Sequence, residues 1–178
     1  MSIKVIVCVK QVIDPDAPIG SLNINEDNIV SSKERQFVIN GYDENAVEAA
    51  LKIKDDMDAY ITVLSVGNEF ENDVMKKPIS MGADRLILIK DPDFKNIGSF
   101  TTVEVLGKAV EKIGEFDLIL CGRQASDWDN SYVPLALSEM LDIACVTLAQ
   151  KIEMTPNGIR VERVLSGGYQ IVEAEFPA

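Results

Sequence analysis

Four short apolar runs, rich in valine, isoleucine and leucine, constrain the fold of this chain more than any other feature of its sequence. Apolar residues follow one another in them with almost no polar alternation. This pattern is typical of strands that are buried on both faces of a parallel sheet. The runs are IKVIVCVK (3–10), AYITVLSVG (59–67), DRLILIK (84–90) and DLILCG (117–122).

Helix-like patterns separate the four runs. Apolar residues recur at spacings of three and four in residues 43–57, and residues 99–114 are amphipathic and close with Gly114, a residue type that often follows a last helical turn. Strands that alternate with helices predict an α/β fold, with a three-layer, Rossmann-like parallel sheet between helices. The expected helices are 43–57, 69–82 with a kink or end at Pro78, 99–114, and 133–141 with Pro134 near its first turn.

The pattern changes after residue 145. Residues 148–155 and 158–176 alternate with period two and are broken by PNG (156–158) and SGG (166–168), which predicts a C-terminal antiparallel β segment. Residues 15–39 predict a loop with a small hairpin around Asn25, Glu26 and Asp27. Since no repeat or long linker interrupts the chain, we expect residues 1–178 to form a single domain.

Charge and hydropathy argue against several classes of partner. The formal net charge is −12 and no basic run is present, which argues against nucleic acid and against anionic membrane surfaces. No apolar run approaches the roughly 20 residues of a membrane span. The amino-terminal residues show no signal-peptide pattern. We expect a cytoplasmic or organelle-matrix protein without membrane insertion.

The chain contains no histidine, which removes Ser-His-Asp and Cys-His nucleophile systems and the commonest metal ligand. Cys8, Cys121 and Cys145 lie in or beside apolar segments without CxxC spacing, which favours buried thiols in a reducing compartment. We expect no metal site and no catalytic residue. A hydrolase that uses Asp127 and Asp129 is a weak alternative, because two acids in one turn are more often hydrogen-bond acceptors.

A polar segment directly after the fourth run is the main candidate for a ligand site. Gly122 is followed by RQASDWDNS (123–131), and ligands of parallel α/β sheets bind outside the carboxyl ends of the strands. Gly122 would let the backbone approach a ligand, the following amides would form an anion nest, and Arg123 would add positive charge. Asp127 and Asp129 are expected to face hydroxyls or amides, because a carboxylate repels a phosphate. The alternative is a solvated Asx-rich turn.

A second polar group, NGYD (40–43), is expected at the same edge. Asn40 suits a helix N-cap and Asp43 the third helical position, but a cap does not explain Gly41 and Tyr42. No G-x-G-x-x-G follows the first run and no Walker A sequence is present, so the common dinucleotide and P-loop fingerprints are both missing.

Several segments, in order along the chain, resemble the β subunit of electron transfer flavoprotein. The most specific is GRQASDWDNSYV (122–133), which is similar to the family signature G-[KR]-Q-A-x-D-x-D. The others are VIVCVKQVID (5–14), INGYDENAVEAAL (39–51), VLSVG (63–67) with ISMGADRLILI (79–89), and RVLSGGYQIVEAEFPA (163–178).

The resemblance implies an adenine nucleotide α-hydrolase-like domain that acts as an electron carrier subunit and not as an enzyme. Such a subunit forms a heterodimer with an α subunit that holds most of the redox-active FAD, and it serves a flavoprotein dehydrogenase such as acyl-CoA dehydrogenase. It buries AMP, or a second FAD in the electron-bifurcating branch. The nucleotide positions that carry over are Cys8, Asn40, Gly41, Tyr42, Asp43, Val66, Gly122, Arg123, Gln124, Ala125, Ser126, Asp127, Trp128, Asp129, Asn130, Ser131, Tyr132 and Val133.

The sequence also departs from the family pattern. Gly41 stands where the family usually has proline, and Trp128 where it has a small or acidic residue. Residues 131–133 replace the common N-Q-T, so side-chain contacts to phosphate are not carried over there. The D-x-D-x-x-x-V form is slightly closer to the bifurcating branch. After residue 178 the family continues with another strand and an L-N-E-P-R loop that docks the dehydrogenase, which the sequence does not include.

A stand-alone adenine-nucleotide sensor similar to universal stress proteins is the alternative, because that class shares the broad architecture. Those proteins usually carry a G-x-x-G…G-S phosphate loop near the C-terminus, and this sequence has none. The electron transfer subunit is therefore the favoured interpretation.

Overall fold

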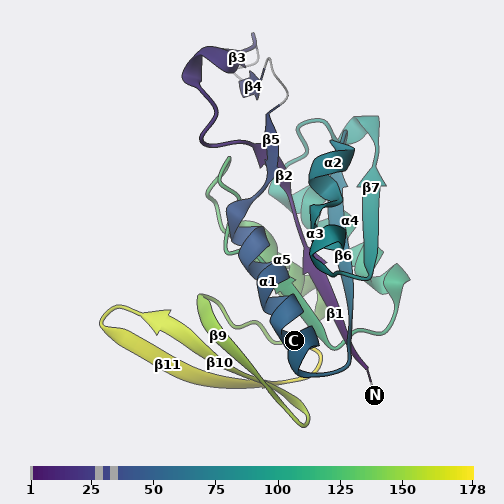
Figure 1. The fold of residues 1–178 in the computed structure, drawn as a ribbon, viewed down its shortest axis with the longest axis vertical. Coiled ribbons are helices and arrows are strands. Elements are labelled where there is room, and N and C mark those ends of the chain that lie inside the picture. Colours follow the sequence, from purple (N-terminus) through teal and green to yellow (C-terminus); the bar gives the residue numbers. More distant parts are fainter. Residues whose placement is uncertain (1, 27–29, 33–35) are drawn as a thin grey trace.

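Four parallel strands form the central sheet in a computed structural model of the protein, which describes residues 2–26, 30–32 and 36–178 (Figure 1). The strand order is β7-β6-β1-β8. All four predicted runs are confirmed as strands: β1 (Ile3–Cys8), β6 (Ala59–Gly67), β7 (Arg85–Lys90) and β8 (Leu118–Cys121).

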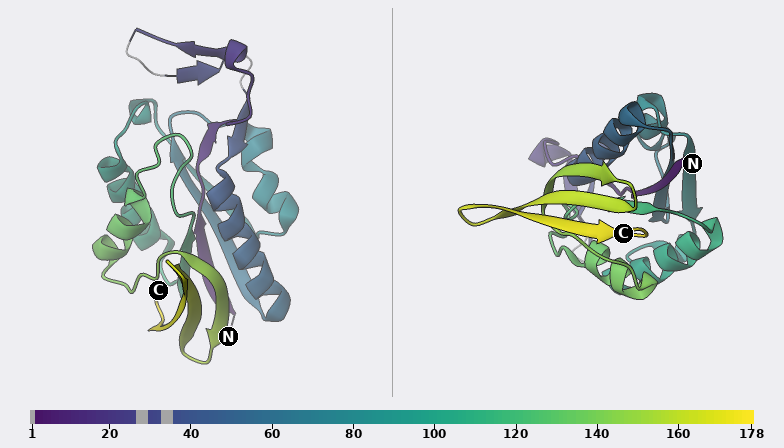
Figure 2. Two further views of the ribbon diagram at one scale, coloured as in Figure 1. Left: turned by 90° about the vertical axis from the view of Figure 1, so that its left-hand side faces the viewer. Right: turned by 90° about the horizontal axis from the view of Figure 1, so that it is seen from below.

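Helices cover both faces of this sheet, which confirms the three-layer α/β architecture (Figures 1 and 2). One face carries α1 (Gly41–Asp56), α2 (Asn72–Met75) and α3 (Lys77–Met81), and the other carries α4 (Ser99–Ile113) and α5 (Tyr132–Leu141). Pro78 lies in the first turn of α3, so the helix expected at 69–82 is divided in two, as a proline without an amide hydrogen requires.

The side chains of β1 explain why its sequence is apolar without alternation. Val5 and Val7 belong to the core on the α1 side, while Ile6 and Cys8 belong to the core on the α4 and α5 side. Successive strand residues point to opposite faces, so a strand between two helical layers must be apolar at every position.

The C-terminal part is an antiparallel sheet of β9 (Ala149–Thr155), β10 (Gly158–Leu165) and β11 (Gly168–Glu175), as predicted. Ile159 and Val161 of β10 join the α1-side core, which attaches this sheet to the body of the domain. The final residue, Ala178, pairs with the edge of β8 through hydrogen bonds of 3.1 Å to Asp117 and 2.8 Å from Ile119.

A smaller ribbon extends from the opposite end of the molecule (Figure 2). There β2 (Gln11–Ile13) pairs with β5 (Phe37–Ile39), and β3 (Leu22–Ile24) pairs with β4 (Val30–Ser32). The predicted hairpin is therefore confirmed in its strands, while Asp27 lies outside the described residues. Two short 3-10 turns complete the described structure, Ile19–Ser21 and Pro92–Phe94.

The three cysteines differ in exposure. Cys8 is buried and Cys121 is half-buried, whereas Cys145 is exposed. The expectation that all three are buried is wrong for Cys145, because it lies in the irregular segment between α5 and β9 and not on a covered strand. Across the described ranges, no helix is both long and apolar enough to cross a membrane.

Candidate functional site

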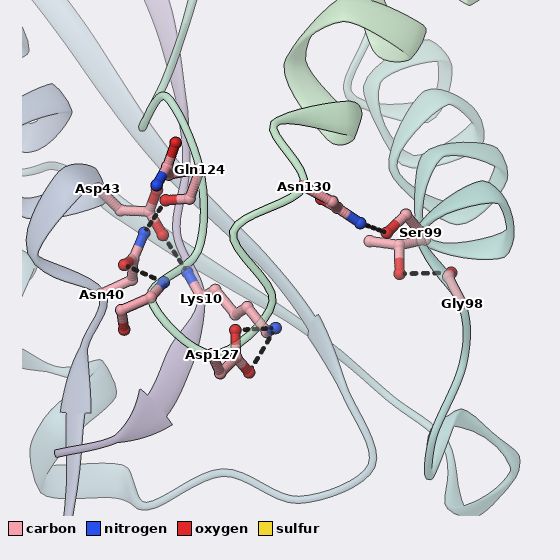
Figure 3. Close-up of polar contacts among 10 residues, drawn as sticks. Lys10, Asn40, Asp43, Gly98, Ser99, Gln124, Asp127 and Asn130 are labelled. Atoms are coloured by element: carbon pink, nitrogen blue, oxygen red, sulfur yellow. Dashed lines mark hydrogen bonds and ion pairs between the residues drawn. The ribbon is translucent and has the colours of Figure 1, made fainter. Parts of the chain in front are cut away.

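Three chain segments meet at the carboxyl edge of the sheet (Figure 3). They are the residues after β1, the start of α1, and the loop of residues 122–131 between β8 and α5. The sequence predicted the last two at this edge, and the structure joins them directly.

Asn40 is completely buried and fastens the loop to the start of α1. Its Nδ2 donates to the Gln124 carbonyl oxygen at 2.8 Å, and its Oδ1 accepts from the Ser126 amide at 3.1 Å. Asn40 does occupy the N-cap position, but its side chain makes no capping hydrogen bond. The capping explanation for this side chain is therefore wrong, because its polar atoms are used by a loop more than 80 residues away in sequence.

Asp43 is a buried carboxyl group that joins the same segments. One oxygen accepts from the Lys10 amide at 2.8 Å and the other accepts from the Gly122 amide at 3.1 Å. Burial raises the pKa of Asp43 to about 7, although hydrogen bonds from Asn40, Lys10 and Gly122 act to lower it. Asp43 is the third residue of α1, as predicted, but its carboxyl group holds the ends of β1 and β8 to the helix.

Gly122 is required for a contact within the protein. A Cβ atom at this position would lie 2.7 Å from the backbone nitrogen of Asp43 and 2.7 Å from the backbone carbon of Tyr42. The absent side chain therefore lets the first turn of α1 pack against the end of β8. We expected a glycine at position 122 because it would give room to a ligand. In the structure, the glycine gives room to the backbone of α1.

Gln124 organises the interior of the loop. Its Oε1 accepts from Arg123 Nε at 3.0 Å and from Ser131 Oγ at 3.1 Å, and its Nε2 donates to Asp129 Oδ1 at 2.6 Å. Asp129 therefore faces an amide, as expected. Asp129 and Ser131 have positive φ angles of 52° and 51°, a conformation that is unfavourable for residues other than glycine.

Asp127 faces a cation that the sequence analysis missed. Lys10 Nζ contacts both carboxylate oxygens of Asp127 at 2.7 Å, across 117 positions of sequence (Figure 3). The prediction that Asp127 faces hydroxyls or amides is therefore wrong for this structure. The sequence did contain one indication that Lys10 lies at the site, because Lys10 comes shortly after a strand that ends there.

The remaining loop residues lie toward the start of α5. Asn130 Nδ2 donates to Ser99 Oγ at 2.7 Å, and Asn130 Oδ1 accepts from the Tyr132 amide at 3.3 Å. Trp128 is exposed, and Ala125 accepts from the amides of Trp128 and Asp129. The anion nest is therefore smaller than expected, because the amides of Gly122, Ser126, Trp128, Asp129 and Tyr132 already have acceptors.

Two backbone donors and two cationic side chains near the loop suit an anionic group. Within the described chain the amides of Ser131 and Val133 bond to no other residue, and both lie at the amino end of α5, where the helix dipole favours negative charge. Lys10 adds an ammonium group and Arg123 a guanidinium group, whose centre lies 5.3 Å from the ring centre of Tyr42. Gly41 begins α1 in open space.

Three of the predicted site residues lie in the apolar layer below the loop. Cys8, Val66 and Val133 belong to the core on the α4 and α5 side. Ser65, near the end of β6 and on the opposite face of the sheet from Val66, is 1% exposed, and its Oγ has no hydrogen-bond partner in the part of the chain that the structure describes. No cluster able to hold a metal ion is found among the described residues.

Fold and site together define a parallel α/β domain with a fastened polar loop at the carboxyl edge of its sheet. A family model described as electron transfer flavoprotein domain matches residues 28–178. The acryloyl-CoA reductase electron transfer subunit gamma of Anaerotignum propionicum is 35% identical over 176 residues, which are 98% of this chain and 65% of that protein.

Two further relatives agree with this match. Electron transfer flavoprotein subunit beta of Thermoanaerobacterium thermosaccharolyticum is 33% identical over 98% of this chain and 65% of its own length. Protein FixA of Azorhizobium caulinodans is 33% identical over 97% of this chain and 63% of its own length. The chain belongs to the electron transfer flavoprotein family and is similar to its beta-type subunits, of which it spans about two thirds.

Proposed function

We propose that this chain binds an adenine nucleotide, AMP or FAD, at the carboxyl edge of its sheet and supports electron transfer between flavoproteins. The observation that carries the proposal is the fastening of loop 122–131 by two buried residues. Asn40 and Asp43 fix the inner side of the loop. The Lys10 ammonium group and the backbone amides in the first turn of α5 therefore lie beside the loop, where they can donate hydrogen bonds to a ligand.

The phosphate of the nucleotide is assigned to the start of α5. The amides of Ser131 and Val133 supply neutral donors, and Lys10 supplies a positive charge that now neutralises Asp127. The positive φ angles of Asp129 and Ser131 support a functional loop, because unfavourable backbone conformations gather where binding requires them. A bound FAD would supply redox chemistry, whereas AMP would act as a structural ligand.

A flavoprotein partner completes the proposal. Relatives carry names such as caffeyl-CoA reductase-Etf complex subunit, which supports assembly with an FAD-containing α subunit and a dehydrogenase of the acyl-CoA type. Exposed apolar side chains on the C-terminal sheet, Val164, Leu165, Tyr169 and Ile171, are consistent with a surface that a partner covers.

Exchange of Lys10 for methionine tests the phosphate assignment. A hydrogen bond to a charged group contributes about 1.5–3 kcal/mol, so Lys10→Met should weaken AMP or FAD binding by roughly 10-fold or more. Asp127→Asn should have the opposite effect, because it removes a negative charge and frees Lys10. Titration calorimetry at low salt measures both affinities.

Lys4→Met is the matched control. Lys4 lies near the start of β1, the strand that Lys10 follows, and it pairs there with Glu115 at 2.8 Å. The control should bind like the unchanged protein. Equal affinities of the Lys10 and Lys4 variants would contradict the assignment, as would weaker binding in Asp127→Asn.

A further inference from the structure

The three cysteines, scattered in sequence, come together beside the ends of β1 and β8. Cys8 and Cys121 are direct partners in the parallel register of these strands. Both side chains lie in the same apolar cluster, on the α4 and α5 side of the sheet. This is a pair of adjacent thiols and not a set of isolated apolar residues.

The separation of the two strands is compatible with a covalent link. Neighbouring strands lie about 4.7–4.9 Å apart, and the Cα atoms of disulfide-bonded cysteines are usually about 4.4–6.8 Å apart. Register partners in a parallel pair point in the same direction, so a bridge must draw the two strand ends together. Strained disulfides of this kind are easily reduced, which favours a reversible bond over a permanent one.

Access to the pair is through Cys121. Cys121 lines a mainly apolar cavity of about 580 Å³ between β8, α5 and β10. The exposed Cys145 lines the same cavity. The neighbouring Cys8 thiol, and after it burial, raise the pKa of the Cys121 thiol. Cys121 should therefore react more slowly than Cys145, and small neutral reagents should reach it best.

We propose that Cys8 and Cys121 form a reversible dithiol–disulfide pair that is oxidised by low-molecular-weight disulfides. The Cys121 thiolate attacks one sulfur of the reagent, forms a mixed disulfide and releases one thiol. The Cys8 thiolate then attacks Cys121 Sγ, forms the Cys8–Cys121 bond and releases the second thiol. The protein loses two electrons and two protons, and the reagent gains them as two thiols.

The pair is placed where its state affects the proposed nucleotide site. Cys121 directly precedes Gly122, whose amide donates to Asp43, and Cys8 lies two residues before Lys10. A bond between Cys8 and Cys121 draws the ends of β1 and β8 together. It therefore shifts the backbone that leads into Lys10 and into the loop that begins at Gly122. The bridge therefore links the thiol state of the protein to the geometry of that edge.

Peptide mapping of the native protein tests the pair. Folded protein is treated with hydroxyethyl disulfide, quenched with a thiol-blocking reagent and digested without reduction. We expect modification of Cys145 first, then a linked peptide pair that contains Cys8 and Cys121 with the loss of two hydrogens, and full reversal by dithiothreitol. In Cys145→Ser the same linked pair should form, and in Cys8→Ser it should be absent.

Two results would overturn the proposal. One is that Cys8 and Cys121 stay free thiols while Cys145 is fully modified. The other is a linked pair that joins Cys145 to either of them in place of the bond between Cys8 and Cys121. Mapping on the unchanged protein decides the matter even where a variant folds poorly, and it does so whether or not any nucleotide binds.

Discussion

Gly122→Ala is expected to destabilise the chain by at least about 3 kcal/mol, and Gly122→Val by more, because both place a Cβ atom inside the first turn of α1. That atom would lie 2.2 Å from Asp43 Oδ1 and 2.7 Å from the Asp43 backbone nitrogen. The backbone of a helix cannot yield as a flexible side chain can. The displaced helix would also lose the hydrogen bond from the Gly122 amide to Asp43.

Urea denaturation measures the effect, and Gly41→Ala is the matched control. Gly41 begins the same helix, but a Cβ atom there meets nothing within 4 Å. The control should be neutral or stabilised by about 0.4–1 kcal/mol, because alanine restricts the unfolded chain. A stability of Gly122→Ala equal to that of Gly41→Ala would show that α1 does not pack against the end of β8 as described.

The stability of the protein is expected to fall as pH rises from about 5 to about 8, through the titration of Asp43. Burial raises the pKa of this carboxyl group to about 7, whereas an unfolded aspartate has a pKa of about 3.9. A raised native pKa contributes stability that is complete below the unfolded pKa and is lost as pH passes the native pKa. Between pH 5 and pH 8 the loss is roughly 2–3 kcal/mol.

Comparison with Asp43→Asn isolates this contribution, because every other titrating group is shared. The variant should be less stable at low pH, since its amide nitrogen faces one of two backbone donors, Lys10 or Gly122. The unchanged protein loses stability as pH rises and the variant does not, so the deficit of the variant should shrink and the two stability curves should approach each other or cross. Parallel curves from pH 5 to pH 8 would contradict a carboxyl group that ionises near neutrality in the folded state.

The layers of the fold could be predicted from the sequence because their signals are local. Each apolar run shows its own burial on two faces, and Pro78 marks the division between α2 and α3 within a few residues. The alternating residues 148–176 likewise show antiparallel strands through period and turn residues alone.

The contacts inside the site could not be predicted in this way, because each joins distant segments. An asparagine before a helix is usually a cap, and nothing near Asn40 indicates that its partners are Gln124 and Ser126. Similarly, Lys10 resembles any solvated lysine until the fold brings Asp127 to it. The glycine after β8 was predicted to matter, but its contact with α1 depends on how the helix crosses the sheet.

The nucleotide content of the purified protein shows whether the edge of the sheet at residues 122–131 binds an adenine nucleotide. The chain is produced alone and together with an α subunit of the same family, and each preparation is denatured. The released small molecules are then identified by chromatography and mass spectrometry. We expect an adenine nucleotide, AMP or FAD, in near-equimolar amount from at least one preparation. If neither preparation releases AMP, ADP or FAD, and the folded chain gives no binding heat or thermal shift with any of them, then the loop of residues 122–131 is not a nucleotide site.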